Sequence, residues 1–176
     1  MSQLPLKPIG SFSLKDPAGK SVQTPDPKAV LTVAFFVIPE CPIANRYSPE
    51  IKRICDAYES KKVAFRLVFA DPDVTATQAK KHLKDFGLDC PGILDSKMAL
   101  SKATGATISP EAAVLDPTGK VLYRGRIDDL YVSHGNRRPN PKRRDLRIAI
   151  DEALSGKPVS VPVTTTTGCY LRVDGK

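Results

Sequence analysis

The stretch from Val30 to Ser60 constrains the fold most, because an apolar run turns directly into a helical pattern at a cysteine. Val30 to Val37 is nearly continuous in β-branched and aromatic residues, which predicts a central strand buried on both faces of a sheet. Pro42 has no backbone N–H and suits the first helical position, and apolar residues then recur at helical spacing from Ile43 to Tyr58. We therefore expect Cys41 at a helix N-terminus.

A cysteine in that place is a candidate nucleophile. The unpaired N–H groups and the positive end of the helix dipole favour the thiolate over the thiol. The neighbouring Glu40 would oppose this effect if its side chain pointed toward the sulfur.

Two motifs resemble the thioredoxin superfamily, in particular the redoxins that include alkyl hydroperoxide reductase and thiol-specific antioxidant proteins. The first is Cys41 followed eight residues later by Pro49, and the second is Gly105 to Pro110 followed by a hairpin sequence from Glu111 to Lys120. The resemblance covers roughly residues 10 to 155. It departs at Ala44, where the family carries the second cysteine of its Cys-x-x-Cys pair.

The resemblance implies an α/β fold of the thioredoxin type, with a central mixed β-sheet flanked by helices and an N-terminal β-hairpin. It implies that Pro110 is a cis-proline that guides an extended partner chain past Cys41. We accordingly expect a cis Ser109–Pro110 bond and place Ser109 and Pro42 among the substrate-binding residues.

Length and composition indicate one compact domain. The chain has 176 residues, of which 41% are hydrophobic. We expect a redoxin domain over residues 1–158 and a C-terminal tail over residues 159–176. Much of the net charge of +8 comes from the segment 137–147, which suggests either a basic patch or a solvated loop and helix start.

The remaining helices and strands follow from periodicity and turn residues. The expected strands are 12–14, 21–23, 63–69, 93–95, 112–115 and 121–126, and the expected helices are 75–86, 97–104 and 143–154. In the helix 75–86, Ala76, Ala79, Leu83 and Phe86 are expected to face inward and His82 outward. His134 is expected in solvent, in a polar loop over residues 128–142.

The four cysteines are too few and too widely spaced to indicate a disulfide scaffold or a zinc site. Cys55 is expected to be a buried structural thiol, and Cys90, before Pro91, a structural thiol in a loop. Cys169 follows a threonine run and a glycine in the tail, and it is our candidate for resolving Cys41. The tail between Ser155 and Cys169 is long enough to reach the site, but an incidental cysteine in a disordered tail is the alternative.

Arg124 and Arg126 are two residues apart and are expected on one sheet face. There they would bind either a substrate anion or the nearby Asp128 and Asp129.

These residues predict a thiol-disulfide oxidoreductase in which Cys41 attacks and Cys169 is the candidate resolving cysteine. The alternatives are an atypical hydroperoxide-reducing thiol peroxidase and a non-enzymatic binding module. The peroxidase is disfavoured because Ala34 and Ile38 occupy positions where a peroxiredoxin has proline and threonine. The oxidoreductase would act on a protein disulfide or a hydroperoxide and be recharged by an external thiol.

We expect no cofactor, no metal, no nucleic-acid partner and no membrane span. The compartment is left open, with the bacterial periplasm if a leader was removed and the cytoplasm otherwise.

Overall fold

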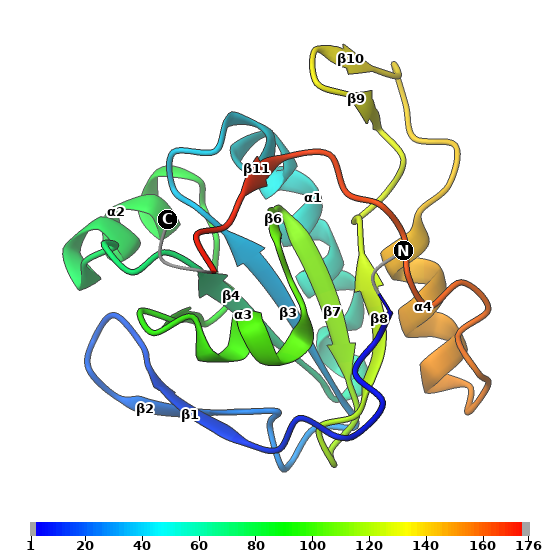
Figure 1. The fold of residues 1–176 in the computed structure, drawn as a ribbon, viewed down its shortest axis with the longest axis horizontal. Helices are drawn as coiled ribbons and strands as arrows, with labels where there is room; N and C mark the ends of the chain where they lie inside the picture. The colour runs from blue at the N-terminus through cyan, green and yellow to red at the C-terminus, as the bar shows by residue number, and fades with distance from the viewer. Residues whose placement is uncertain (1–2, 174–176) are drawn as a thin grey trace.

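A computed structural model describes residues 3–173 and contains a seven-stranded mixed sheet in the order β2-β1-β5-β4-β3-β7-β8 (Figure 1). The strands of this sheet are β1 (Phe12–Lys15), β2 (Ser21–Thr24), β3 (Leu31–Val37), β4 (Val63–Phe69), β5 (Gly92–Leu94), β7 (Glu111–Leu115) and β8 (Val121–Gly125). Strand β3 is parallel to β4 and antiparallel to β7. The expected α/β fold with a central mixed sheet is confirmed.

The helices are α1 (Pro42–Tyr58), α2 (Ala76–Asp85), α3 (Ala99–Thr104) and α4 (Asp145–Leu154), with a short 3-10 turn (Glu59–Lys61) after α1. Alternate residues of β3 face two separate cores. Phe35 and Val37 pack with residues of α1 and α4, whereas Ala34 and Phe36 pack with residues of α3. The fully buried strand predicted from the apolar run is therefore confirmed.

The N-terminal hairpin is also confirmed, because β1 and β2 pair antiparallel. Asp16 shapes the turn between them by accepting hydrogen bonds from the N–H groups of Ala18 and Lys20. The hairpin continues the main sheet, since Lys15 of β1 pairs with Leu94 of β5.

Among the described residues, four short strands lie outside the main sheet, and none of them was predicted. Strands β9 (Tyr131–Ser133) and β10 (Asn136–Arg137) form a hairpin within the expected polar loop. Strand β6 (Ile108–Ser109) pairs with β11 (Cys169–Tyr170), so the C-terminal segment is not free of regular structure. Figure 1 shows this segment running back across the molecule to β6.

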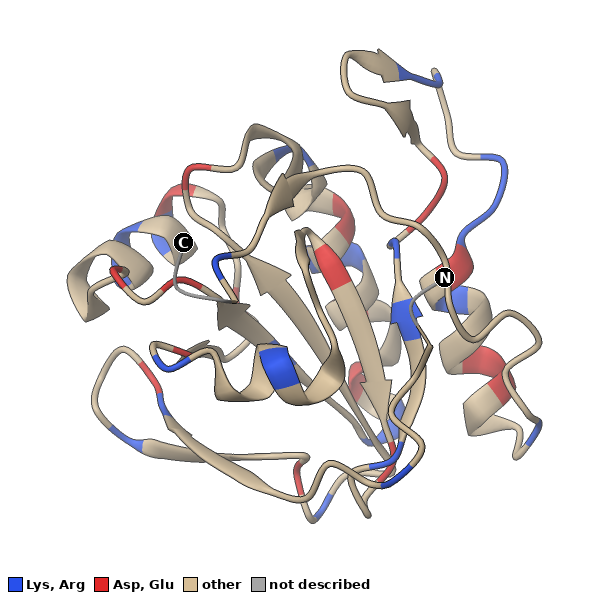
Figure 2. Cartoon of the chain, viewed as in Figure 1, with Lys and Arg blue, Asp and Glu red and all other residues tan. Residues whose placement is uncertain are grey.

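The basic segment 137–147 is neutralised mainly by internal ion pairs. Arg144 and Arg147 both contact Glu50 of α1, at 3.1 and 2.9 Å, and Arg143 contacts Asp145 at 2.9 Å. Figure 2 shows acidic residues interspersed with basic ones along this segment and α4. The segment therefore fastens α4 to α1 more than it presents a uniform basic surface.

Among residues 3–173, no helix is long and apolar enough to cross a membrane.

Candidate active site

Cys41 lies at the N-cap of α1, directly after the turn that follows β3. Its backbone is extended, its side chain is only 2% exposed, and its sulfur accepts a hydrogen bond from the Ala44 N–H at 3.4 Å. Pro42 occupies the first helical position and is exposed. The sulfur is thus held where the first turn of the helix presents unpaired donors.

The segment before β7 contacts Cys41 from the other side. The Ser109–Pro110 peptide bond is cis. The Cys41 thiol donates to the Ser109 carbonyl oxygen at 3.2 Å, and the Ile38 N–H donates to the Ser109 hydroxyl at 3.0 Å. Ser109 therefore contacts both ends of the turn that carries the cysteine.

The C-terminal segment brings Cys169 to the same place. Strand β11 sets Cys169 opposite Ser109, and the Leu171 N–H donates to the Thr107 carbonyl oxygen at 2.8 Å. Both Cys41 and Cys169 are free thiols. Burial, together with the hydrogen bond and the charge of the adjacent Cys41 sulfur, raises the pKa of Cys169 to about 12.

Gly168 allows this close approach. A Cβ atom at this position would clash with the Ser109 carbonyl group. The His134 Nε2–H donates to the Gly168 carbonyl oxygen at 2.7 Å. His134 is exposed, as expected, and it also contacts the backbone next to Cys169.

Arg124 does not line the site as predicted. Its side chain is 3% exposed, forms an ion pair with Glu111 at 3.3 Å and donates to the Thr104 carbonyl oxygen. Glu111 in turn accepts hydrogen bonds from the N–H groups of Thr107 and Ile108. Arg124 therefore supports the segment that leads into Ser109, and burial keeps it from a substrate anion.

Arg126 does not lie in a strand beside Arg124, as was predicted. Strand β8 ends at Gly125, so Arg126 lies beyond the strand and the alternation of side chains no longer applies. Its Nε contacts Asp145 at the start of α4 at 2.7 Å. Within the described residues, no contact joins Arg126 to either free thiol, and its ion pair is with Asp145 and not with the expected Asp128 or Asp129.

His82 was expected on the outer face of its helix but is 6% exposed. It packs between the rings of Phe69 and Phe86, and its Nε2 lies 2.8 Å from the Asn45 side-chain oxygen. Phe86, expected inside, is 38% exposed. Burial lowers the pKa of His82, although the nearby Asp85 and Glu40 act against this shift.

Asn45 is a residue near the site whose contacts the sequence did not indicate. Its side-chain N–H donates to the Pro39 carbonyl oxygen at 2.8 Å, while its oxygen meets His82. It therefore holds the turn before Cys41 against α1. Its position four residues after Cys41, one turn along the helix, was the available signal.

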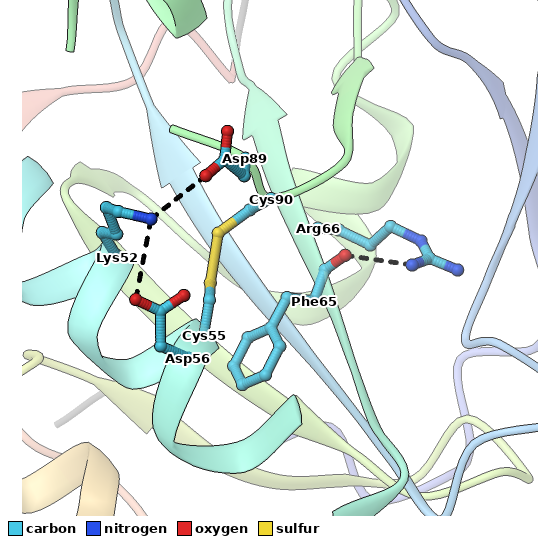
Figure 3. Close-up of a disulfide and its surroundings, with 7 residues drawn as sticks. All are labelled: Lys52, Cys55, Asp56, Phe65, Arg66, Asp89 and Cys90. Carbon is cyan, nitrogen blue, oxygen red and sulfur yellow. Dashed lines mark hydrogen bonds and ion pairs between the residues drawn. A yellow bond between two sulfur atoms is a disulfide. The ribbon is translucent and has the colours of Figure 1, made fainter. Parts of the chain in front are cut away.

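Cys55 and Cys90 form a disulfide, which corrects the expectation of two structural thiols (Figure 3). The bond links α1 to the loop before β5 and closes a loop over a sequence separation of 35. Cys55 lies fourteen residues beyond Cys41, or about 20 Å along a helix at ~1.5 Å per residue. The disulfide is thus a separate feature from the free thiol pair.

The Redoxin family model matches residues 6–133 of this chain. No curated protein matches the sequence.

Several solved structures have the same fold. An uncharacterized conserved protein from Geobacillus kaustophilus is 27% identical, with a TM-score of 0.79 and coverage of 97% of this chain and 92% of that one. A hypothetical protein from Sinorhizobium meliloti 1021 is 22% identical, with a TM-score of 0.82 and coverage of 100% and 97%. A thiol-disulfide oxidoreductase from Bacteroides fragilis NCTC 9343 is 22% identical, with a TM-score of 0.58 and coverage of 67% and 89%. The chain therefore has a thioredoxin-like fold.

Proposed function

The chain belongs to the Redoxin family, and we propose that it is a thiol-disulfide oxidoreductase with Cys41 as nucleophile and Cys169 as resolving cysteine. One observation carries this proposal. The pairing of β11 with β6 sets Cys169 opposite Ser109, and the Ser109 carbonyl oxygen accepts the hydrogen bond of the Cys41 thiol. Two cysteines 128 positions apart in the sequence thereby both lie beside Ser109.

In the first step, the Cys41 thiolate attacks one sulfur of a partner's disulfide. A bond forms between Cys41 and that sulfur, and the partner's other sulfur leaves as a thiolate that takes up a proton. The Ala44 N–H and the start of α1 stabilise the attacking anion. The partner chain would lie beside Pro42, Ser109 and Pro110 once β11 has left the edge of β6.

In the second step, Cys169 attacks the Cys41 sulfur of the mixed disulfide. The partner's remaining sulfur leaves as a thiolate, and the enzyme is left with a Cys41–Cys169 disulfide. The partner has then gained two electrons and two protons, and the enzyme has lost them. An external thiol returns the enzyme to its reduced form.

The raised pKa of Cys169 explains why Cys41 acts in the first step of the proposed reaction and Cys169 in the second. Burial and the adjacent Cys41 sulfur oppose ionisation of Cys169 in the reduced protein. Once Cys41 is bound in the mixed disulfide, its sulfur is neutral and no longer opposes ionisation of Cys169. Cys41 therefore reacts first and Cys169 second.

The test is a single turnover of insulin disulfides by the pre-reduced protein, without added reductant. We expect the wild type to release reduced insulin chains and to end with a Cys41–Cys169 disulfide in peptide maps. Cys41→Ser should react no faster than buffer, and Cys169→Ser should remain joined to insulin through Cys41. Thr165→Ala, at an exposed position in the same segment, is the matched control and should behave as the wild type.

A parallel assay with a hydroperoxide distinguishes the alternatives. Faster turnover of the hydroperoxide than of insulin would replace the proposal by a peroxidase. If neither substrate depends on Cys41, the chain is a binding module and the proposal is wrong. Recovery of Cys41 as an intermolecular dimer with Cys169 free would remove the resolving role.

A further inference from the structure

A cleft of about 710 Å³ lies beside the Cys55–Cys90 disulfide, and both cysteines line it. This volume is in the range that holds small ligands or short peptides. Cys55 is half-buried, whereas Cys90 is 6% exposed. A thiol in the cleft would therefore approach the disulfide from the side of Cys55.

One wall of the cleft is acidic. Lys52 lies 3.0 Å from Asp89 and 3.6 Å from Asp56, so these three residues together carry one net negative charge beside the disulfide. Figure 3 shows them grouped on one side of the sulfur atoms. A positively charged group would be favoured at this wall.

The other wall is basic. Asp26 and Arg66 pair at 3.1 Å, which leaves the exposed Lys28 and Lys62 on this wall without an ion pair of their own among residues 3–173. A carboxylate would be favoured here. The two walls together are complementary to a ligand that carries both an ammonium and a carboxylate group.

The cleft also contains a strand edge. Strand β5 pairs with β4 only from Leu67 onward, and the preceding residues of β4, Val63 to Arg66, line the cleft. The edge of a strand offers N–H and C=O groups to an extended peptide, and here the Phe65 carbonyl oxygen already accepts a hydrogen bond from Arg66 at 3.0 Å (Figure 3). A short peptide therefore fits the cleft better than a compact charged molecule.

We propose that this cleft is a second thiol-disulfide exchange site, which binds a short zwitterionic peptide thiol that reduces the Cys55–Cys90 disulfide. The peptide thiolate bonds to Cys55, the Cys55–Cys90 bond breaks, and Cys90 leaves as a thiolate that takes up a proton. A second peptide thiolate then attacks the peptide sulfur and releases Cys55. Two peptide thiols become one peptide disulfide, and the protein gains two electrons and two protons.

The test uses the full chain with Cys41→Ser and Cys169→Ser, so that only this disulfide can exchange and the result is independent of the proposed function. The probes are the tripeptide Gly-Cys-Gly with free ends and the same peptide acetylated and amidated. The measured quantity is the rate at which Cys55 and Cys90 become alkylatable. Each rate is divided by the rate at which the same probe peptide reduces the disulfide of a short linear reference peptide. This division removes the difference in intrinsic thiol reactivity between the two probes.

We expect the peptide with free ends to react about fivefold faster than the capped peptide after this correction, as two partly screened ion pairs would give. The preference for the peptide with free ends should disappear in the double variant Asp89→Asn/Lys62→Gln and at high salt. It should persist in the control Lys20→Gln, whose exposed side chain lies on the N-terminal hairpin turn. Equal corrected rates, or reduction only as fast as global unfolding, would overturn the proposal. If the variant with Cys41→Ser and Cys169→Ser does not fold, the wild type is used. The rate of alkylation at Cys55 and Cys90 is then measured by peptide mapping.

Discussion

At the scale of single residues, the site depends on one buried ion pair that touches neither free thiol. Glu111 pairs with Arg124 and also receives the N–H groups of Thr107 and Ile108, so it fixes the backbone that presents Ser109 to Cys41. Both charged side chains are more than nine-tenths buried. Breaking such a pair leaves an uncompensated charge in a poorly solvated place.

Glu111→Gln should lower the free energy of unfolding by about 3–5 kcal/mol, the range for removal of one partner of a buried pair. Urea denaturation at neutral pH with an unchanged m-value measures this loss. Glu59→Gln is the control, because Glu59 is exposed and should change stability little. A loss as small in Glu111→Gln as in the control would mean that Arg124 is compensated in another way.

At the scale of elements, the pairing of β11 with β6 depends on Gly168, where a side chain would meet the Ser109 carbonyl group. Gly168→Ala should loosen β11. We expect hydrogen exchange of the Leu171 amide, which bonds to Thr107, to accelerate by about tenfold or more, equivalent to ~1.4 kcal/mol. Thr165→Ala should leave this exchange unchanged, and unchanged exchange in Gly168→Ala would show that the segment adapts without detaching.

The long elements could be predicted from the sequence because their signals are local. The continuous apolar run gave β3, and the cysteine and proline at its end located the start of α1. Strands of two or three residues, such as β6, β9 and β11, contain too few positions for a period of two to appear. Strands β6 and β11 form because segments distant in the sequence meet, whereas β9 pairs with the neighbouring β10.

The same distinction explains the errors at the site. The place of Cys41 at a helix N-terminus was predicted from a local pattern, whereas the Cys55–Cys90 pairing joins residues 35 positions apart and depends on where α1 meets the loop before β5. Arg126 was assigned by strand alternation, which ended one residue earlier at Gly125. His82 was assigned to the outside because it lies among lysines, but Asn45 provides the partner that a buried imidazole needs.

At the scale of the whole molecule, carboxylates join segments that are distant in the sequence. Glu50 of α1 contacts Arg144 and Arg147 near and in α4. Burial raises the pKa of Glu50, but hydrogen bonds from Arg53 and Arg147 outweigh it, so the pKa lies below its ordinary value of 4.5. The folded chain therefore binds fewer protons here than the unfolded chain, and the stabilisation is present above the ordinary pKa and lost as the pH falls through the lowered one.

We expect the free energy of unfolding to fall as the pH is lowered from about 5 to 3. Glu50→Gln should be about 2 kcal/mol less stable at neutral pH, as for loss of a charged hydrogen bond, and should show a smaller decrease over this interval. Denaturation curves at a series of pH values measure both quantities. An equal decrease in the free energy of unfolding in the wild type and in Glu50→Gln would assign the acid sensitivity to other carboxylates. Asp129 is one of them, because backbone hydrogen bonds outweigh its burial and lower its pKa.

The place of β11 also decides when a partner can be admitted. The strand covers the edge of β6 beside Cys41, so a partner chain that is to lie along this edge must first displace β11. In the proposed cycle, the reduced protein can release the strand, whereas the oxidised protein is bound to it through Cys169. The oxidised enzyme would thus be unable to bind new substrate until a reductant small enough to reach the sulfur atoms released β11. A partner would then distinguish the reduced from the oxidised protein by conformation as well as by redox state.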